Sequence, residues 1–165
     1  RQVHFLAKEE LFQRPVLGQF LKWVNTHPIR RGGGDRAALR QCVELLRQGR
    51  TVLIFPEGTR THDGQLQEGR PGAAMIALQA EAPICPVYID GTFEAMPRTA
   101  KRPIRQKLRV FVGELIDPVS AVDGLERRER NEALTRLIME RIAGLREQAL
   151  AMRCGETVAS AQDAG

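Results

Sequence analysis

The chain has 165 residues, of which 42% are hydrophobic, 27% are charged and 5% are aromatic, with a net charge of +5. This composition predicts one globular domain. It excludes a disordered chain, a disulfide scaffold and a membrane-spanning bundle, because the apolar content is ordinary, the 3 cysteines are widely spaced, and no apolar run is long enough to span a bilayer.

Helical and extended patterns alternate along the chain. Asp35 suits the N-terminal cap of a helix, and Gly49 suits the end of the same helix. Pro15 fits a first helical turn, and Asp123 with a Glu three positions later resembles a capping box. The expected elements are, in chain order, a strand at residues 3–7, helices at 9–13 and 15–24, an irregular stretch at 25–34, a helix at 35–49, a strand at 51–55, a loop at 58–72, a helix at 72–80, strands at 84–89 and 108–112, and a long helix from 123 onward.

This order indicates the fold class. The stretches 51–55 and 84–89 are apolar throughout, which is typical of strands that are covered on both faces. We therefore expect an α/β fold with a mostly parallel central sheet flanked by helices. A single domain is predicted over residues 1–150, and residues 151–165 are small and polar enough to predict a frayed tail.

The most informative stretch is Phe-Pro-Glu-Gly-Thr-Arg at residues 55–60, directly after a predicted strand. Open α/β sheets bind ligands at the carboxyl ends of their strands. Gly58 permits a tight turn that brings backbone N–H groups near an anion, while Thr59 adds a hydroxyl and Arg60 a guanidinium suited to phosphate oxygens. An ordinary turn with a solvated arginine explains the same residues equally well.

Three further basic residues lie just after a predicted strand or just before a predicted helix: Lys8, Arg31 and Arg70. In a parallel α/β layout these places share one edge of the sheet, so we expect the three to converge with Arg60 on one phosphate. Taken singly, each is explained as well by a solvated side chain, or, for Arg31, by a flexible connector through residues 32–34.

Catalytic groups are scarce. His4 is expected to be a packed strand residue and Cys85 a buried small side chain, while His27 and His62 fall in loops. The basic segment 98–109 lacks aromatic residues for stacking on bases, so no nucleic-acid partner is predicted, whereas anionic lipid headgroups fit it at least as well.

The apolar helix at residues 15–24 carries Phe20 and Trp23. A surface that meets lipid and a helix face that packs on the core are equally compatible with this pattern.

Several motifs, in order, resemble the glycerophospholipid acyltransferase family, which includes the 1-acyl-glycerol-3-phosphate acyltransferases. Arg31 stands at the basic position of the second motif, and Lys8 is the basic residue of the segment before it. The stretches that carry the resemblance are residues 5–11, 28–35, 55–60, 69–74 and 82–87.

The resemblance implies transfer of a fatty acyl group from acyl-CoA or acyl-carrier protein to a lysophosphatidate-type acceptor in phospholipid biosynthesis. It implies no metal or redox cofactor, and a protein associated with the cytoplasmic face of a membrane without a transmembrane segment in this chain. Lys8, Arg31 and Arg60 would hold the acceptor's phosphate.

The resemblance also assigns the remaining residues of the turn and shows one departure. Gly58 and Thr59 would shape the turn and contribute donors, and Glu57 would orient Arg31 or Arg60 through an ion pair. The family's first motif, His-x-x-x-x-Asp, which supplies the base, is absent, since His4 is followed by Glu9 in the corresponding place. We expect an N-terminal truncation with the base encoded upstream, and no catalytic residue in this chain; a non-catalytic lipid- or anion-binding module on the same fold is the alternative.

Overall fold

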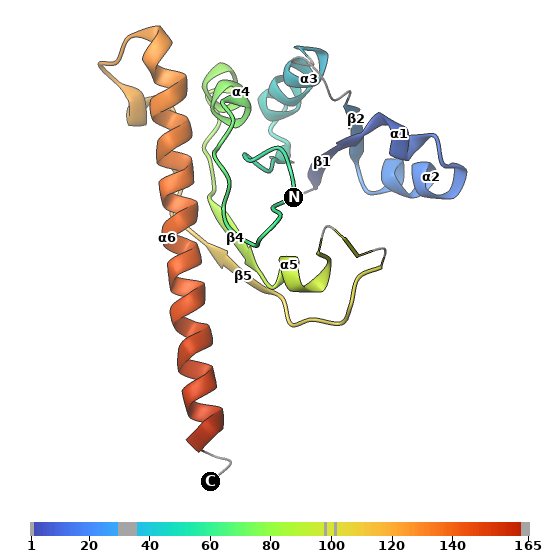
Figure 1. Cartoon of the computed structure of the whole chain (residues 1–165). Coiled ribbons are helices and arrows are strands. Elements are labelled where there is room, and N and C mark those ends of the chain that lie inside the picture. The colour runs from blue at the N-terminus through green and yellow to red at the C-terminus, as the bar shows by residue number, and fades with distance from the viewer. Residues whose placement is uncertain (1, 30–35, 98, 101, 163–165) are drawn as a thin grey trace.

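A parallel sheet forms the first half of the molecule (Figure 1). In the computed structural model, which describes residues 2–29, 36–97, 99–100 and 102–162, the central strand is β1 (Val3–Lys8). It pairs in parallel with β2 (Thr26–Ile29) on one side and with β3 (Thr51–Leu53) on the other. Because the three strands are parallel, their carboxyl ends lie at one edge of the sheet.

A second, antiparallel sheet consists of β4 (Val87–Asp90) and β5 (Arg109–Val112). The strand predicted at 108–112 is present, and the one predicted at 84–89 begins only at Val87, with Ile84 in an isolated bridge to Ile116. The two strands pair with each other and not with the parallel sheet. One face of this pair packs on the long helix α6 (Arg127–Gln162), which Figure 1 shows running the length of the molecule.

The remaining helices are α1 (Glu9–Phe12), α2 (Pro15–Trp23), α3 (Arg36–Arg47), α4 (Gly72–Ala80), α5 (Thr92–Ala95) and the 3-10 turn η1 (Ser120–Val122). Helices α1 to α4 lie close to their predicted ranges, whereas α5 and η1 were not predicted. Gly49 ends the helix before β3 with a φ of 72°, a conformation that favours glycine. Among the described residues, none of these helices, nor α6, is long and apolar enough to cross a membrane.

Helix α4 lies between the two halves of the core. Its residue Ile76 packs with Cys42 and Val43 of α3, while its residue Ala74 packs against α6. On α6 the predicted apolar stripe is confirmed as the buried face, since Leu134, Leu137, Ile138, Ile142, Leu145 and Ala149 are buried or packed against the core. Burial of each large aliphatic side chain contributes about 1.5–3 kcal/mol, so this stripe accounts for much of the attachment of α6.

Three local predictions differ from the structure in the first half of the chain. The stretch 25–34 was predicted irregular, yet it contains β2, whose Pro28 is accommodated because β2 is an edge strand. β3, the other edge strand, ends at Leu53, and Phe55 is exposed, although Val52 and Ile54 pack against the core between α3 and α4. Cys85 is exposed and not buried, because Ile84 and Pro86 on either side of it point into the core and the extended chain alternates.

The predicted boundaries of the last helix also differ. The capping-box position Asp123 precedes the helix by several residues, and the first turn of α6 forms instead on the Glu126 carbonyl, which accepts hydrogen bonds from the backbone N–H groups of Glu129 and Arg130. The helix continues past Met152 to Gln162, where a frayed tail was predicted. An ion pair formed by Arg153 lies at the point where the tail was predicted to begin.

That ion pair joins α6 to the antiparallel sheet. Arg153 donates from Nε to Asp90 Oδ2 at 2.7 Å, its Nη2 lies 2.6 Å from Asp90 Oδ1, and Nη1 lies 2.7 Å from Glu94 Oε1. Asp90 is 2% exposed, and Arg109, from the predicted basic segment, lies 3.5 Å from it. The hydrogen bond from Arg153 holds the pKa of Glu94 below its ordinary value.

Candidate functional site

The carboxyl edge of the parallel sheet carries the candidate site. β1 ends there at Lys8, whose backbone lies opposite Ile29 of β2, and the turn at 55–60 leaves the same edge after β3. Arg31 lies outside the described residues, as does the side chain of Lys8, so their predicted convergence with Arg60 stays a prediction. The backbone order of the three strands is consistent with it.

The turn after β3 is built on Gly58. Its backbone N–H donates to the Phe55 carbonyl at 3.0 Å, and its φ of 66° lies in the left-handed region that favours glycine. Its own N–H is therefore used within the turn, so the donor that was expected to reach a ligand is already occupied.

Two hydrogen bonds close the neck of the loop that follows. The Glu57 carboxylate accepts a hydrogen bond from the Gln67 backbone N–H at 2.7 Å, and the Arg70 N–H donates to the Pro56 carbonyl at 2.8 Å. Among the described residues the Glu57 carboxylate makes no ion pair with Arg60. Glu57 thus fastens the loop through a backbone partner that no sequence pattern indicates, because the two residues are ten positions apart across irregular chain.

The closed neck places Arg70 over Gly58. A Cβ added to Gly58 would lie 3.1 Å from Cδ and 3.3 Å from Nε of Arg70, so the arginine side chain covers the turn. Thr59, Arg60 and Arg70 are all exposed. Two exposed guanidinium groups at one closed loop can bind an anion, since each offers several N–H donors suited to phosphate oxygens.

The tip of the loop is held by Asp63. Its carboxylate accepts hydrogen bonds from the Thr61 hydroxyl at 2.9 Å and from the Gln65 backbone at 3.0 Å. These bonds, the backbone bond first, lower the pKa of Asp63. The far side of the loop reaches α6, where Arg146 donates to the Gln65 side chain at 2.6 Å. The loop is therefore anchored at its neck, at its tip and on α6.

A chain of polar side chains crosses the sheet beneath this edge. The Gln41 amide nitrogen, which can only donate, lies 2.7 Å from His27 Nδ1, and His27 Nε2 lies 3.0 Å from His4 Nδ1. His27 Nε2–H therefore donates to His4, whose own Nε2 is buried and has no hydrogen-bond partner within the described part of the chain. Burial, and then the proximity of His4, lower the pKa of His27.

This pair was found in part from the sequence. His4 is 8% exposed, which confirms that it is a packed strand residue. His27 was placed in a loop because β2 was missed. Within the described part of the chain the two rings bond to each other and to Gln41 and not to a carboxylate, so the pair differs from the His-x-x-x-x-Asp arrangement.

The other reactive side chains are dispersed. Burial raises the pKa of the Cys42 thiol to about 11, while Cys85 and Cys154 are exposed. Over residues 2–29, 36–97, 99–100 and 102–162, no three His, Cys, Asp or Glu side chains gather as a metal site would require.

Comparison with known proteins gives consistent matches. The family model described as Acyltransferase matches residues 1–90. The 1-acyl-sn-glycerol-3-phosphate acyltransferase of Bacillus subtilis (strain 168) is 34% identical over 148 residues, which cover 87% of this chain and 69% of that protein. The lyso-ornithine lipid O-acyltransferase of Pseudomonas aeruginosa is 33% identical over 135 residues, covering 81% of this chain and 49% of that protein.

A solved structure has the same fold. The crystal structure of the 1-acyl-sn-glycerophosphate (LPA) acyltransferase PlsC from Thermotoga maritima superposes with a TM-score of 0.72 at 30% identity. The match covers 90% of this chain and 57% of that one. The chain thus spans little more than half the length of the solved relative.

Proposed function

The chain belongs to the acyltransferase family, and on that premise we propose that it moves a fatty acyl group from an acyl-CoA or acyl-carrier-protein thioester to the hydroxyl of a lysophosphatidate-type acceptor in phospholipid synthesis. The observation that carries this proposal is the closed loop at the carboxyl edge of the sheet, where Arg70 covers Gly58 and Arg60 is exposed beside it. A phosphate is the group of the acceptor that two guanidinium groups recognise.

The residues of the loop act on the acceptor by positioning it. Arg60 and Arg70 bind the phosphate, and Lys8 and Arg31 supply further positive charge. A phosphate held in this way fixes the acceptor hydroxyl relative to the thioester, and such positioning lowers the entropic cost of the reaction. Glu57 contributes indirectly, because it closes the loop that carries the arginines.

The reaction itself forms an ester bond and breaks a thioester bond. The acceptor oxygen attacks the thioester carbonyl carbon, a base takes the hydroxyl proton, and the donor leaves as a thiolate that is then protonated. No metal or redox cofactor is required for this exchange. The sequence has no His-x-x-x-x-Asp pair, so we propose that the base is supplied from outside these 165 residues. We also propose that the reaction takes place at the cytoplasmic face of a membrane.

The missing pair also supports a second candidate. A lipid- or anion-binding module on the same fold would keep the closed loop at residues 56–70, here called the arginine loop, and would bind lysophosphatidate without transferring an acyl chain. The coding sequence upstream separates the two: an encoded His-x-x-x-x-Asp motif supports the enzyme, and its absence supports the binding module.

The phosphate role of Arg60 is tested by comparing two ligands. An Arg60→Ala variant should bind 1-oleoyl-lysophosphatidate about tenfold more weakly in calorimetric titration, since a hydrogen bond to a charged group contributes about 1.5–3 kcal/mol. Binding of 1-oleoylglycerol, which lacks the phosphate, should not change. Arg128→Ala, which removes an exposed arginine at the start of α6, is the matched control. Unchanged lysophosphatidate binding in Arg60→Ala would contradict the assignment. For the enzyme, transfer of labelled oleate from oleoyl-CoA to lysophosphatidate should be detected in the protein that carries the base.

A further inference from the structure

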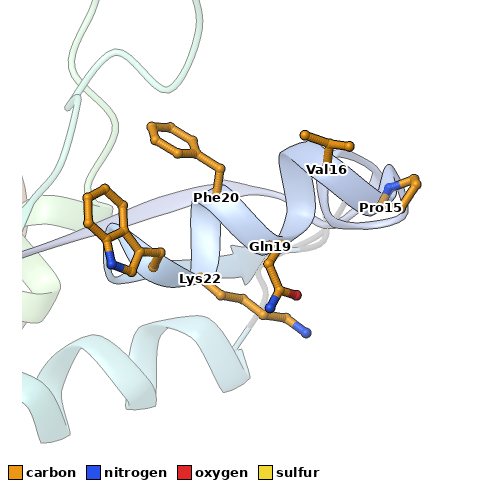
Figure 2. Close-up of a pocket in the computed structure, with 6 residues that line it drawn as sticks. Pro15, Val16, Gln19, Phe20 and Lys22 are labelled. Carbon is orange, nitrogen blue, oxygen red and sulfur yellow. The ribbon is translucent and has the colours of Figure 1, made fainter.

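Helix α2 exposes three large apolar side chains. Val16 is 85% exposed, Phe20 53% and Trp23 80%, and the rings of Phe20 and Trp23 lie 6.2 Å apart. Their spacing of four and three residues places them along one face of the helix. Figure 2 shows Val16 and Phe20 on one side of α2, with Gln19 and Lys22 on the other. The interpretation that this helix packs on the core is therefore wrong for these side chains.

Helix α2 itself carries charges of one sign, while the acidic residues Glu9 and Glu10 belong to the neighbouring α1. Helix α2 has the sequence PVLGQFLKW, which contains no acidic residue. Arg14 directly precedes it and Lys22 lies in its last turn, and both side chains are exposed. Aromatic and branched residues on one face, flanked by basic residues, are the features of a helix that lies in the interface of an anionic bilayer.

We propose that α2 is an interfacial helix, whose face of Val16, Phe20 and Trp23 inserts into the surface of an anionic lipid bilayer. The proposal rests on the proposed function in one respect, because a lipid acceptor resides in such a bilayer. Helix α1 leaves β1 at the edge that carries the arginine loop, and α2 follows it after two residues. Docking through α2 therefore brings the membrane to the part of the molecule where the acceptor's phosphate is bound.

A second basic segment adds charge. Residues 102–108 are exposed and include Arg102 and Arg105. In Figure 1 this loop and α2 both project on the side away from α6. Basic side chains near a membrane surface are attracted by anionic headgroups, so the loop strengthens the preference for anionic lipid.

A second copy of the chain fits this face less well than a bilayer. Large aromatic side chains bury about 150–250 Å² each, so the exposed parts of the three residues offer roughly 400 Å² per molecule. A symmetric contact through this face would then bury about 800 Å² in total, below the roughly 1,200 Å² of a stable interface.

The chain contains a built-in reporter for this proposal, because Trp23 is its 1 tryptophan. Titration with vesicles of equimolar phosphatidylcholine and phosphatidylglycerol should shift the Trp23 emission to shorter wavelength, and brominated lipids should quench it. Vesicles of phosphatidylcholine alone should bind more weakly. An emission spectrum unchanged at saturating anionic vesicles would overturn the proposal, and so would a blue shift that grows with protein concentration without lipid, which would show self-association.

Two variants test whether vesicle binding depends on the apolar face of α2 or on exposed apolar side chains in general. The double variant Val16→Ala/Phe20→Ala keeps the tryptophan and should lower the vesicle partition coefficient about tenfold or more. Leu115→Ala removes an exposed leucine elsewhere and should bind vesicles as the unaltered chain does. Equal thermal midpoints show that the double variant folds; equal vesicle binding by folded double variant and unaltered chain would overturn the proposal.

These vesicles contain no lysophosphatidate, so the test does not depend on the acceptor site. Vesicle binding without lysophosphatidate binding would support the interfacial helix and contradict the proposed function. Lysophosphatidate binding without vesicle binding would support the proposed function and contradict the interfacial helix.

Discussion

Replacement of Gly58 by alanine tests whether the turn positions Arg70. The substitution has two costs that the structure separates. The φ of 66° is left-handed, which costs an alanine about 1–2 kcal/mol. The new Cβ would also lie 3.1 Å from Arg70 Cδ, closer than ordinary van der Waals contact, so the Arg70 side chain must move by a few tenths of an ångström or more.

Gly49 is a matched control. Its φ is 72°, and a Cβ there meets no atom within 4 Å, so Gly49→Ala has the backbone cost without a steric one. In a chain of this size 1 kcal/mol corresponds to about 2–4 °C, so both variants should lower the melting midpoint by roughly 2–8 °C in circular dichroism.

Only Gly58→Ala should impair the site. Displacement of Arg70 removes a charge-assisted hydrogen bond to the phosphate, so lysophosphatidate should bind about tenfold more weakly in calorimetric titration. Gly49→Ala should bind it normally. The reasoning is refuted if the two variants bind equally well at a temperature where both are folded.

Two further predictions concern the scaffold. Arg153→Met removes the closer of the two arginines that contact the buried Asp90 carboxylate and leaves Arg109 at 3.5 Å. The free energy of unfolding should fall by about 3 kcal/mol, measured by urea denaturation. Asp90→Asn in the same chain should recover part of this loss, and a change below about 1 kcal/mol would contradict the role of the pair. Because the pKa of His27 is lowered from 6.5 on folding, the unfolded chain binds more protons, and the melting midpoint should fall as the pH drops below that value. His27→Gln should flatten this dependence; an unchanged slope would rule out His27 as its source.

Local features were predictable from the sequence. The ends of α4 and of α2 follow from prolines, glycines and the spacing of apolar residues, all of which lie within one or two turns of those ends. The structure has both helices within one residue of the predicted ranges. The buried stripe of α6 follows from a 3.6-residue period that holds whatever the helix packs against. The turn at 55–60 was predicted for the same kind of reason, since Pro56 and Gly58 restrict their own backbone.

Features that depend on distant partners were not predictable. β2 is a strand because β1 pairs with it, although its own four residues include a proline. The same applies to the antiparallel pairing of β4 with β5 and to Cys85, which is exposed because its neighbours point into the core.

For this protein, the sequence alone determined helices α2, α3 and α4 to within a few residues, the turn at residues 55–60 and the family, because these depend on residues close together in the chain. Only the tertiary structure decided that Glu57 closes the loop on Gln67, that Arg70 lies over Gly58, and that the apolar face of α2 is exposed. The physical reason is that the hydrogen-bond partners and the burial of these residues depend on segments that are distant in the sequence. A local period or motif does not say which distant segment the fold brings near.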